Sequence, residues 1–252
     1  MCLVFAALNL IPEYRLVIVA NRDEFYGRAS APAARWQHAP QVIAGRDLEA
    51  GGSWLGVTED GRFAALTNYR ESGSVHSNPP SRGALVADFL HSRATTDEYL
   101  AGKQPDVSRY NGFNLLVDDG DTLGYCSNRA PLFQALQPGL YGLSNHLLDT
   151  PWPKVENGKQ RLDMLFATGT LPDFESLFDV MTDQQIPVPE RLPHTGVSPE
   201  YERVLSPAFI RSPIYGTRAT TLVGLGVSGG GFLLERSYDE TGQAVATVEH
   251  RF

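Results

Sequence analysis

Two apolar stretches at the start of the chain decide the fold: CLVFAALN at residues 2–9 and YRLVIVA at residues 14–20. The first predicts a buried strand, and the second, which is rich in β-branched residues, predicts another. Ile11-Pro12-Glu13 lies between them and predicts a turn, so the two strands form a hairpin. Because residues rise by about 3.3 Å along a strand, the end of the second strand returns to the start of the first.

This hairpin brings a polar tetrad, Asn21–Glu24, back towards Cys2, and we expect Asp23 to lie beside it. Cysteine is small enough to allow removal of Met1. Cys2 would then carry both a thiol and a free α-amine, whose ordinary pKa of roughly 7.7–8.0 lets it act as a base. That arrangement is typical of an N-terminal nucleophile.

A structural interpretation of the same residues stays open. Cys2 is then a small buried residue of an edge strand. The tetrad is then a strand-to-loop turn, in which Asn21 and Asp23 cap backbone amides and the other two side chains form an exposed ion pair.

The composition limits the class of protein. With 252 residues, 42% hydrophobic and 20% charged, the sequence is typical of a globular protein, and we expect one domain over residues 1–252. A net charge of -8 without a basic cluster argues against nucleic acid as a partner. Two cysteines exclude a disulfide framework. No apolar stretch approaches the ~20 residues that span a bilayer. We expect a cytoplasmic protein that binds a small molecule, without a metal or cofactor; its oligomeric state is left open.

The rest of the chain alternates between β-rich and helical segments. Loops rich in Gly, Pro and Ser are predicted at 25–40, 69–81 and 184–199, and we expect them to wall the cleft. Gly224–Gly229 matches G-x-G-x-x-G, but a strand follows it, so it predicts a turn. The order predicts an α+β fold with two antiparallel sheets covered by helices. Strands are predicted at 53–58, 62–68, 113–117, 122–127, 141–145, 218–227, 231–238 and 244–250, and helices at 82–91, 95–100, 153–166, 172–181 and 200–205.

Three further polar residues lie at strand ends. Asn68 and Asn145 each end a predicted strand, where a side-chain amide is able to stabilise an oxyanion. An Asx-turn that merely terminates the strand is the alternative for each. Arg218 begins a predicted strand, either as a surface charge or as a cation that stabilises a thiolate or holds substrate.

Together these segments resemble a known family. The near-terminal Cys2 and the tetrad, with TNY at 67–69, GLSN at 142–145 and YGTR at 215–218, are similar to the NRDE family, whose eukaryotic members are called transport and Golgi organisation proteins. That family is related to the N-terminal nucleophile hydrolases of the choloylglycine hydrolase and penicillin V acylase type. The resemblance implies their four-layer αββα fold.

The resemblance also implies roles for residues. Cys2 would be the nucleophile and Asp23 the carboxylate that orients the terminal amine. Asn68 and Asn145 would serve the oxyanion hole, and Arg218 would sit by the thiol. One departure concerns an active-site arginine that the acylases usually carry three residues before the aspartate. Ala20 occupies that position here, and Arg22 directly precedes Asp23. Side chains that are neighbours in a strand point to opposite faces, so Arg22 need not replace the missing group.

Two functions follow as hypotheses. The first is a hydrolase that attacks a linear amide through Cys2; we expect Asn21 and Arg22 at the substrate, with an apolar acyl pocket from Trp36, Tyr69 and Trp152. These aromatic residues are equally consistent with packing. The second is a non-catalytic carrier that uses the same cleft for a small apolar ligand such as a lipid or haem, which the resemblance also permits.

Overall fold

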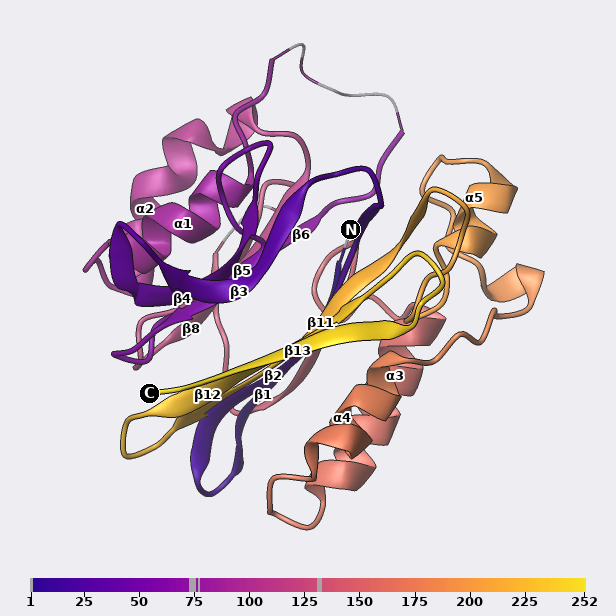
Figure 1. Cartoon of the computed structure of the whole chain (residues 1–252). Helices are drawn as coiled ribbons and strands as arrows, with labels where there is room; N and C mark the ends of the chain where they lie inside the picture. Colours follow the sequence, from indigo (N-terminus) through magenta and orange to yellow (C-terminus); the bar gives the residue numbers. More distant parts are fainter. Residues whose placement is uncertain (1, 73–75, 77, 131–132) are drawn as a thin grey trace.

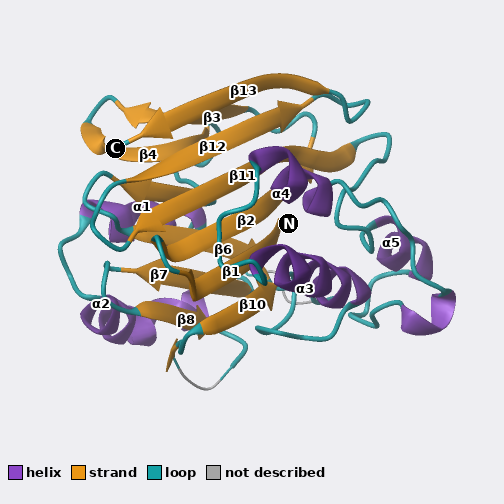
Figure 2. Ribbon diagram, turned by 90° about the horizontal axis from the view of Figure 1, so that it is seen from below, coloured by secondary structure: helices purple, strands orange, loops and turns teal. Residues whose placement is uncertain are grey.

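The computed structural model describes residues 2–72, 76, 78–130 and 133–252; Met1 and part of the predicted loop at 69–81 lie outside the described residues. Two antiparallel sheets face each other, and helices cover their outer faces (Figure 1). The view from below shows α3 and α4 on one side of the paired sheets and α1 and α2 on the other (Figure 2). This is a four-layer αββα sandwich, which confirms the predicted α+β fold.

The first sheet has six strands and contains both ends of the chain. The hairpin predicted from the opening sequence lies within it, between β10 and β11. In spatial order its strands are β10 (Gly139–Leu143), β1 (Cys2–Ile11), β2 (Tyr14–Phe25), β11 (Tyr215–Gly226), β12 (Gly231–Tyr238) and β13 (Ala244–Arg251).

The second sheet has seven strands, and each pairs with its neighbour along the chain. Its order therefore follows the sequence, although the connection from β6 to β7 is long and carries two helices. The strands are β3 (Ser30–Trp36), β4 (Ala39–Asp47), β5 (Leu55–Thr58), β6 (Phe63–Asn68), β7 (Phe113–Asp118), β8 (Leu123–Ser127) and β9 (Gln134–Ala135).

The helices begin and end close to the predicted residues. Those on the outer face of the second sheet are α1 (Gly83–His91) and α2 (Thr96–Lys103), followed by a 3₁₀ turn η1 (Gln104–Arg109). Those on the outer face of the first sheet are α3 (Pro153–Phe166) and α4 (Phe174–Met181). A 3₁₀ turn η2 (Pro189–Arg191) and α5 (Pro199–Val204) lead back to β11. Among the described residues, no helix is both long and apolar enough to cross a bilayer.

Alternation along β1 explains why both faces of the first sheet are buried. Val4 and Ala6 pack in the core between the two sheets. Leu3 and Phe5 point to the other face and pack against α3 and α4. A third apolar cluster joins the second sheet to α1 and α2. Because the side-chain period along a strand is two, Cys2 shares the face of Val4 and begins the row of residues that looks towards the second sheet.

The tetrad Asn21–Glu24 is part of a strand, and not a segment that follows one. β2 continues through it to Phe25 because β11 pairs with β2 along its length, with Tyr215 opposite Phe25. No local pattern indicates this partner, because β11 lies far along the chain and pairs with β2 only in the tertiary structure.

The predicted loop at 25–40 is also wrong, because it contains β3 and the start of β4. β3 lies at the edge of its sheet, and only Ala33 and Trp36 of its side chains are fully buried. A strand with so few buried positions has no clear apolar alternation. Pro32 is tolerated there because an edge strand leaves some of its backbone N–H groups without a ladder partner.

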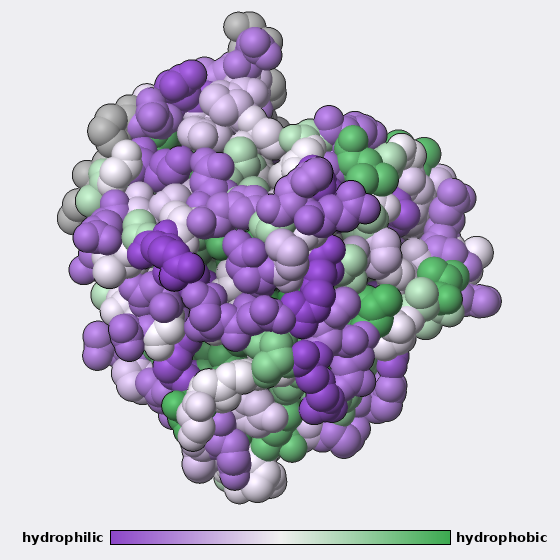
Figure 3. Space-filling view, turned by 60° about the vertical axis from the view of Figure 1, so that its left-hand side comes forward, coloured by the Kyte–Doolittle hydropathy of each residue, from purple (hydrophilic) through white to green (hydrophobic). Residues whose placement is uncertain are grey.

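The surface agrees with the acidic, polar composition. The face in Figure 3 is covered mainly by hydrophilic side chains, with apolar residues in separate small patches. Phe25 is one of the large apolar residues that are exposed, at 47%, and it lies where β2 reaches the cavity described below.

Candidate active site

A cavity of about 530 Å³ opens at the end of the sandwich where β1 begins. Both sheets, the start of α1 and two connecting loops contribute to it. Cys2 lines it with 8% of its surface exposed, so the thiol is accessible from the cavity but shielded from bulk solvent. The lining residues are Cys2, Arg22, Asp23, Glu24, Phe25, Arg28, Asp47, Ala50, Ser53, Trp54, Leu66, Asn68, Pro79, Pro80, Ser81, Arg82, Gly83 and Asn111.

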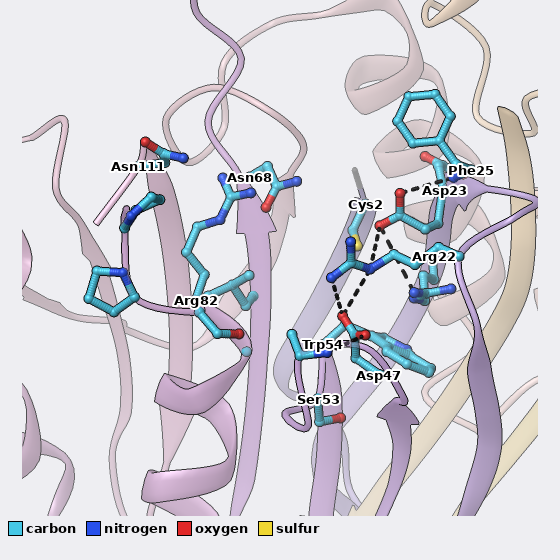
Figure 4. Close-up of a pocket in the computed structure, with 18 residues that line it drawn as sticks. Cys2, Arg22, Asp23, Phe25, Asp47, Ser53, Trp54, Asn68, Arg82 and Asn111 are labelled. Atoms are coloured by element: carbon cyan, nitrogen blue, oxygen red, sulfur yellow. Dashed lines mark hydrogen bonds and ion pairs between the residues drawn. The ribbon is translucent and has the colours of Figure 1, made fainter. Parts of the chain in front are cut away.

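Cys2 and Arg22 are directly opposite each other in the β1–β2 pair, and therefore point to the same face of the sheet. The Arg22 guanidinium lies 4.1 Å from the centre of the Trp54 ring, donates to Ser30 Oγ at 3.4 Å, and is 4.0 Å from Glu24. The side chain is 5% exposed and lines the cavity together with Cys2 (Figure 4).

This geometry bears on the arginine that is missing at Ala20. Ala20 and Arg22 are two residues apart, so they share a face, and Ala20 pairs with Val4 next to Cys2. The guanidinium of Arg22 thus reaches the same side of the sheet that an arginine at position 20 would face, one step closer to the cavity. Alternation along the strand suggested that Arg22 need not replace the missing group; in the structure Arg22 shares the face of Cys2, and Asp23 points to the opposite face.

Asp23 turns towards the helical layer while still lining the cavity. It accepts a hydrogen bond from Thr217 Oγ1 at 2.7 Å and is 1% exposed. Burial raises the pKa of its carboxyl above the usual range, although the positive charges of Lys154 and Arg70 act to lower it. Burial also raises the pKa of the Cys2 thiol; the charge of Asp23 raises it further, and that of Arg22 lowers it. At neutral pH the thiol is therefore protonated and needs a base to become a nucleophile.

A buried group of charges that sequence reasoning missed lies on the helical side of Asp23. Arg70 and Glu202 form an ion pair at 2.7 Å, and each side chain is 4% exposed. Lys154, in the first turn of α3, donates to the carbonyl of Leu205 at 3.0 Å. Burial, with the charge of Arg70 as the next cause, lowers the pKa of Lys154 to about 8. A lysine on an amphipathic helix ordinarily lies at the surface, so no pattern in the sequence distinguished this one.

The structure brings the two predicted asparagines together, in different ways. Asn68 ends β6 and its half-buried side chain lines the cavity. Asn145 lies beyond the end of β10 and is fully buried. Its amide donates to the carbonyl of Asn68 at 2.9 Å, and its oxygen accepts from Arg70 at 3.5 Å. Asn145 thus holds the backbone of Asn68, while the side chain of Asn68 faces the cavity.

Asn21 and Trp36, predicted at the substrate, do not line the cavity. The Asn21 amide donates to the carbonyls of Met181 and Ala208 at 2.8 and 2.9 Å, on the helical face of β2. Trp36 packs between the second sheet and α1, and its indole N–H donates to the carbonyl of Ala44. Alternation along β2 accounts for Asn21, since it has the parity of Asp23 and not that of Arg22.

Tyr69 and Arg218 also lie away from the cavity. The Tyr69 ring contacts that of His146, with centroids 4.9 Å apart. Arg218 sits at a β-bulge, where the pairing of β11 with β2 shifts between Thr217 and Ala219. The bulge re-aims its side chain, and the guanidinium donates to the carbonyl of Tyr26 at 2.9 Å. Arg218 therefore anchors the chain at the end of β2 and does not reach the thiol.

The three predicted loops contribute unequally. Residues 25–40 supply Phe25 and Arg28, and residues 69–81 supply Pro79, Pro80 and Ser81. Residues 184–199 do not line this cavity; they border a smaller one of about 180 Å³ beneath α3. Trp152 stacks 4.9 Å from Arg70, behind the cavity wall.

The chemistry of the cavity is that of a thiol among guanidinium, carboxylate and amide groups. Within the described parts of the chain, no cluster of three or more His, Cys, Asp or Glu side chains is arranged to hold a metal ion.

Comparison of the sequence with known proteins shows which family the chain belongs to. The sequence profile described as Transport and Golgi organisation 2 matches residues 1–240. The chain belongs to this family. The human Transport and Golgi organization protein 2 homolog is 36% identical over 257 residues, which cover 94% of this chain and 93% of the human protein. The Bos taurus homolog is 35% identical over 100% of this chain and 99% of its own length. These relatives confirm the family that the near-terminal cysteine and the tetrad indicated.

A solved structure shows the same fold. The Caenorhabditis elegans ortholog of N-acylethanolamine-hydrolyzing acid amidase superposes with a TM-score of 0.51 at 16% identity, covering 88% of this chain and 92% of that one. The likeness shows that this chain and the amidase share the four-layer αββα fold.

Proposed function

We propose that the chain is an N-terminal cysteine amidohydrolase that cleaves a linear amide, with Cys2 as nucleophile once Met1 has been removed. The observation that carries the proposal is the surroundings of Cys2: it lines a cavity of about 530 Å³, and Asp23 and Asn68 line the same cavity. The fold shared with an acid amidase supports the reaction class.

The proposed mechanism follows from the pKa of the thiol. Because burial raises that pKa, the free α-amine of Cys2 takes the thiol proton as the sulfur attacks the amide carbonyl. Asp23, close to this end of β1, orients the resulting ammonium group. The Asn68 side chain donates to the developing oxyanion, and Asn145 positions Asn68. The ammonium then gives its proton to the leaving nitrogen, the C–N bond breaks, and water hydrolyses the acyl-enzyme.

The proposal is tested by the intact mass of the purified protein, before and after exposure to a panel of N-acyl amides. We expect a species one methionine lighter that gains the mass of an acyl group and then turns over. Cys2→Ala abolishes both acylation and turnover. Cys126→Ala serves as the matched control, because Cys126 lies outside the cavity lining and burial raises its pKa to about 11. Turnover retained by Cys2→Ala would refute the nucleophile assignment.

The same measurement separates the carrier hypothesis from hydrolysis. The size of the cavity favours a bound small molecule in either case, since ligand pockets commonly measure about 300–1,000 Å³. A protein that keeps Met1, binds a lipid or haem and forms no acyl-enzyme would be a carrier on the same fold.

A further inference from the structure

Arg82 lies on the cavity wall that faces Cys2, and the carboxylates of Glu24 and Glu71 act on its charge without forming an ion pair with it. It is the N-cap residue of α1, and its Nη1 donates to the carbonyl of Gly112 at 3.0 Å. No other hydrogen bond of this guanidinium, and no ion pair, occurs among the described residues. Figure 4 shows it beside Asn68 and Asn111, across the cavity from the thiol.

The other cavity arginines differ in this respect. Arg28 is 2.8 Å from Asp47, 3.4 Å from Glu49 and 3.9 Å from Glu24, so three carboxylates balance it. Arg22 is stacked on an indole ring and has Glu24 at 4.0 Å. Within the part of the chain that the structure describes, Arg82 has neither an ion pair nor a cation–π contact. Burial lowers its pKa, with Glu24 as the carboxylate that most opposes this.

A half-buried cation without a counter-ion is costly unless an anion joins it. The guanidinium keeps four of its five N–H donors for a ligand, and this planar fork matches the oxygens of a carboxylate or a phosphate. Asn111 lies on the same wall as Arg82 (Figure 4), and Ser81, which precedes Arg82 in the chain, also lines the cavity; both are able to supply neutral donors. The wall opposite the nucleophile is therefore suited to an oxyanion and not to a neutral apolar group.

We infer that Arg82, with Asn111 and Ser81, forms an anion subsite, and that the molecule bound in the Cys2 cavity carries a carboxylate or phosphate group. The position of the reactive amide rests on the proposed function: the scissile amide of the bound molecule lies at Cys2, and its charged group lies at Arg82. The substrate class is then an anionic N-acyl amide.

Binding to Cys2→Ala tests the inference without requiring turnover. Calorimetry would compare three probes that share one acyl chain: N-octanoylglycine, N-octanoyl-O-phosphoethanolamine and neutral N-octanoylethanolamine. We expect at least one anionic probe to bind about tenfold or more tightly than the neutral one, because a charge-assisted bidentate contact is lost in the neutral probe. Which anionic probe binds better distinguishes a carboxylate from a phosphate.

Substitution assigns the effect to Arg82. In the Cys2→Ala background, Arg82→Gln should remove the preference for the anionic probe, whereas Arg28→Gln, at a cavity arginine that is already paired, should keep it. Arg82→Lys keeps the positive charge but loses the planar, bidentate guanidinium, so it should bind the anionic probe about threefold or more weakly than the parent. This variant replaces Arg82→Gln in the test if Arg82→Gln does not fold.

Equal binding of charged and neutral probes, no binding of either anionic probe, or a preference that survives both Arg82 substitutions would overturn the inference. These outcomes are distinct from failure of the proposed function. Tight binding of an anionic probe that wild-type protein never cleaves would refute the hydrolase and leave the subsite standing. Turnover of neutral amides without an anion preference would refute the subsite alone.

Discussion

At the cavity end of β2, the polar side chains on its two faces differ in how completely the protein satisfies their hydrogen bonds. On the helical face, the Asn21 amide donates to the carbonyl of Met181 at 2.8 Å and the Asp23 carboxylate accepts from Thr217 at 2.7 Å, with a charged cluster behind them. On the cavity face, Arg22 has a ring contact, one long hydrogen bond and a carboxylate at 4.0 Å. The helical face therefore holds the strand in position, and the cavity face keeps its donors available to a ligand.

The largest effect is expected from breaking the helical face at Arg70. Arg70→Ala leaves the Glu202 carboxylate buried without its partner, 2.7 Å away in the native protein. Removing one member of a buried pair costs about 3–5 kcal/mol of unfolding free energy. Urea unfolding measures this loss of unfolding free energy. The double variant Arg70→Met, Glu202→Gln removes both charges and should lose much less. An equal loss in both variants would mean that Arg70 does not stabilise the protein through its ion pair with Glu202.

A second comparison separates the two asparagines. Asn68→Ala should lower kcat by about a hundredfold or more, the cost of an oxyanion donor, with little change in stability because its side chain is half-buried. Asn145→Ala should also lower the free energy of unfolding, by about 1–3 kcal/mol, because the carbonyl of Asn68 loses its buried donor. Chemical denaturation and steady-state kinetics measure the two effects. If both variants change kcat and the free energy of unfolding alike, the assignment of Asn68 as donor and Asn145 as positioning residue is wrong.

The buried lysine makes stability depend on pH. Lys154 has a pKa of about 8 in the folded protein, below its ordinary 10.5, so the unfolded chain binds more protons between these values. Stability should therefore rise as pH increases from about 8 towards 10.5, as the unfolded state loses its advantage. Denaturation at a series of pH values tests this, with Lys154→Met as the control that removes the rise. An identical pH profile in both proteins would contradict the assignment.

The smallest effect concerns the cavity face. A double-mutant cycle with Trp54→Leu and Arg22→Met should give a coupling energy of about 0.5–2 kcal/mol, as expected for a partly desolvated cation–π contact. Thermal or urea unfolding of the four proteins supplies the cycle. A coupling near zero would show that the ring does not hold the guanidinium beside Cys2.

The sequence predicted much of this protein because local periodicity carries strand and helix information. The opening hairpin, the helix at 153–166 and the closing strands were predicted within a few residues, and the near-terminal cysteine with its tetrad indicated the family. Cys2, Asp23, Asn68 and Arg22 were predicted at the site, and all four line one cavity.

What the sequence alone determined is the alternation of each strand, and hence which residues are able to share a face. Only the tertiary structure decided which face meets the cavity. Asn21 and Arg22 are neighbours, and the sequence predicted both at the substrate equally. The pairing of β1, β2 and β11 buries Asn21 on the helical face and places Arg22 on the face of the thiol. Lys154 and Arg82 are ordinary in sequence. Packing against distant elements buries the first, and it leaves the second without an ion pair to any residue that the structure describes. Burial and charge balance depend on contacts between segments far apart in the chain, which local patterns do not encode.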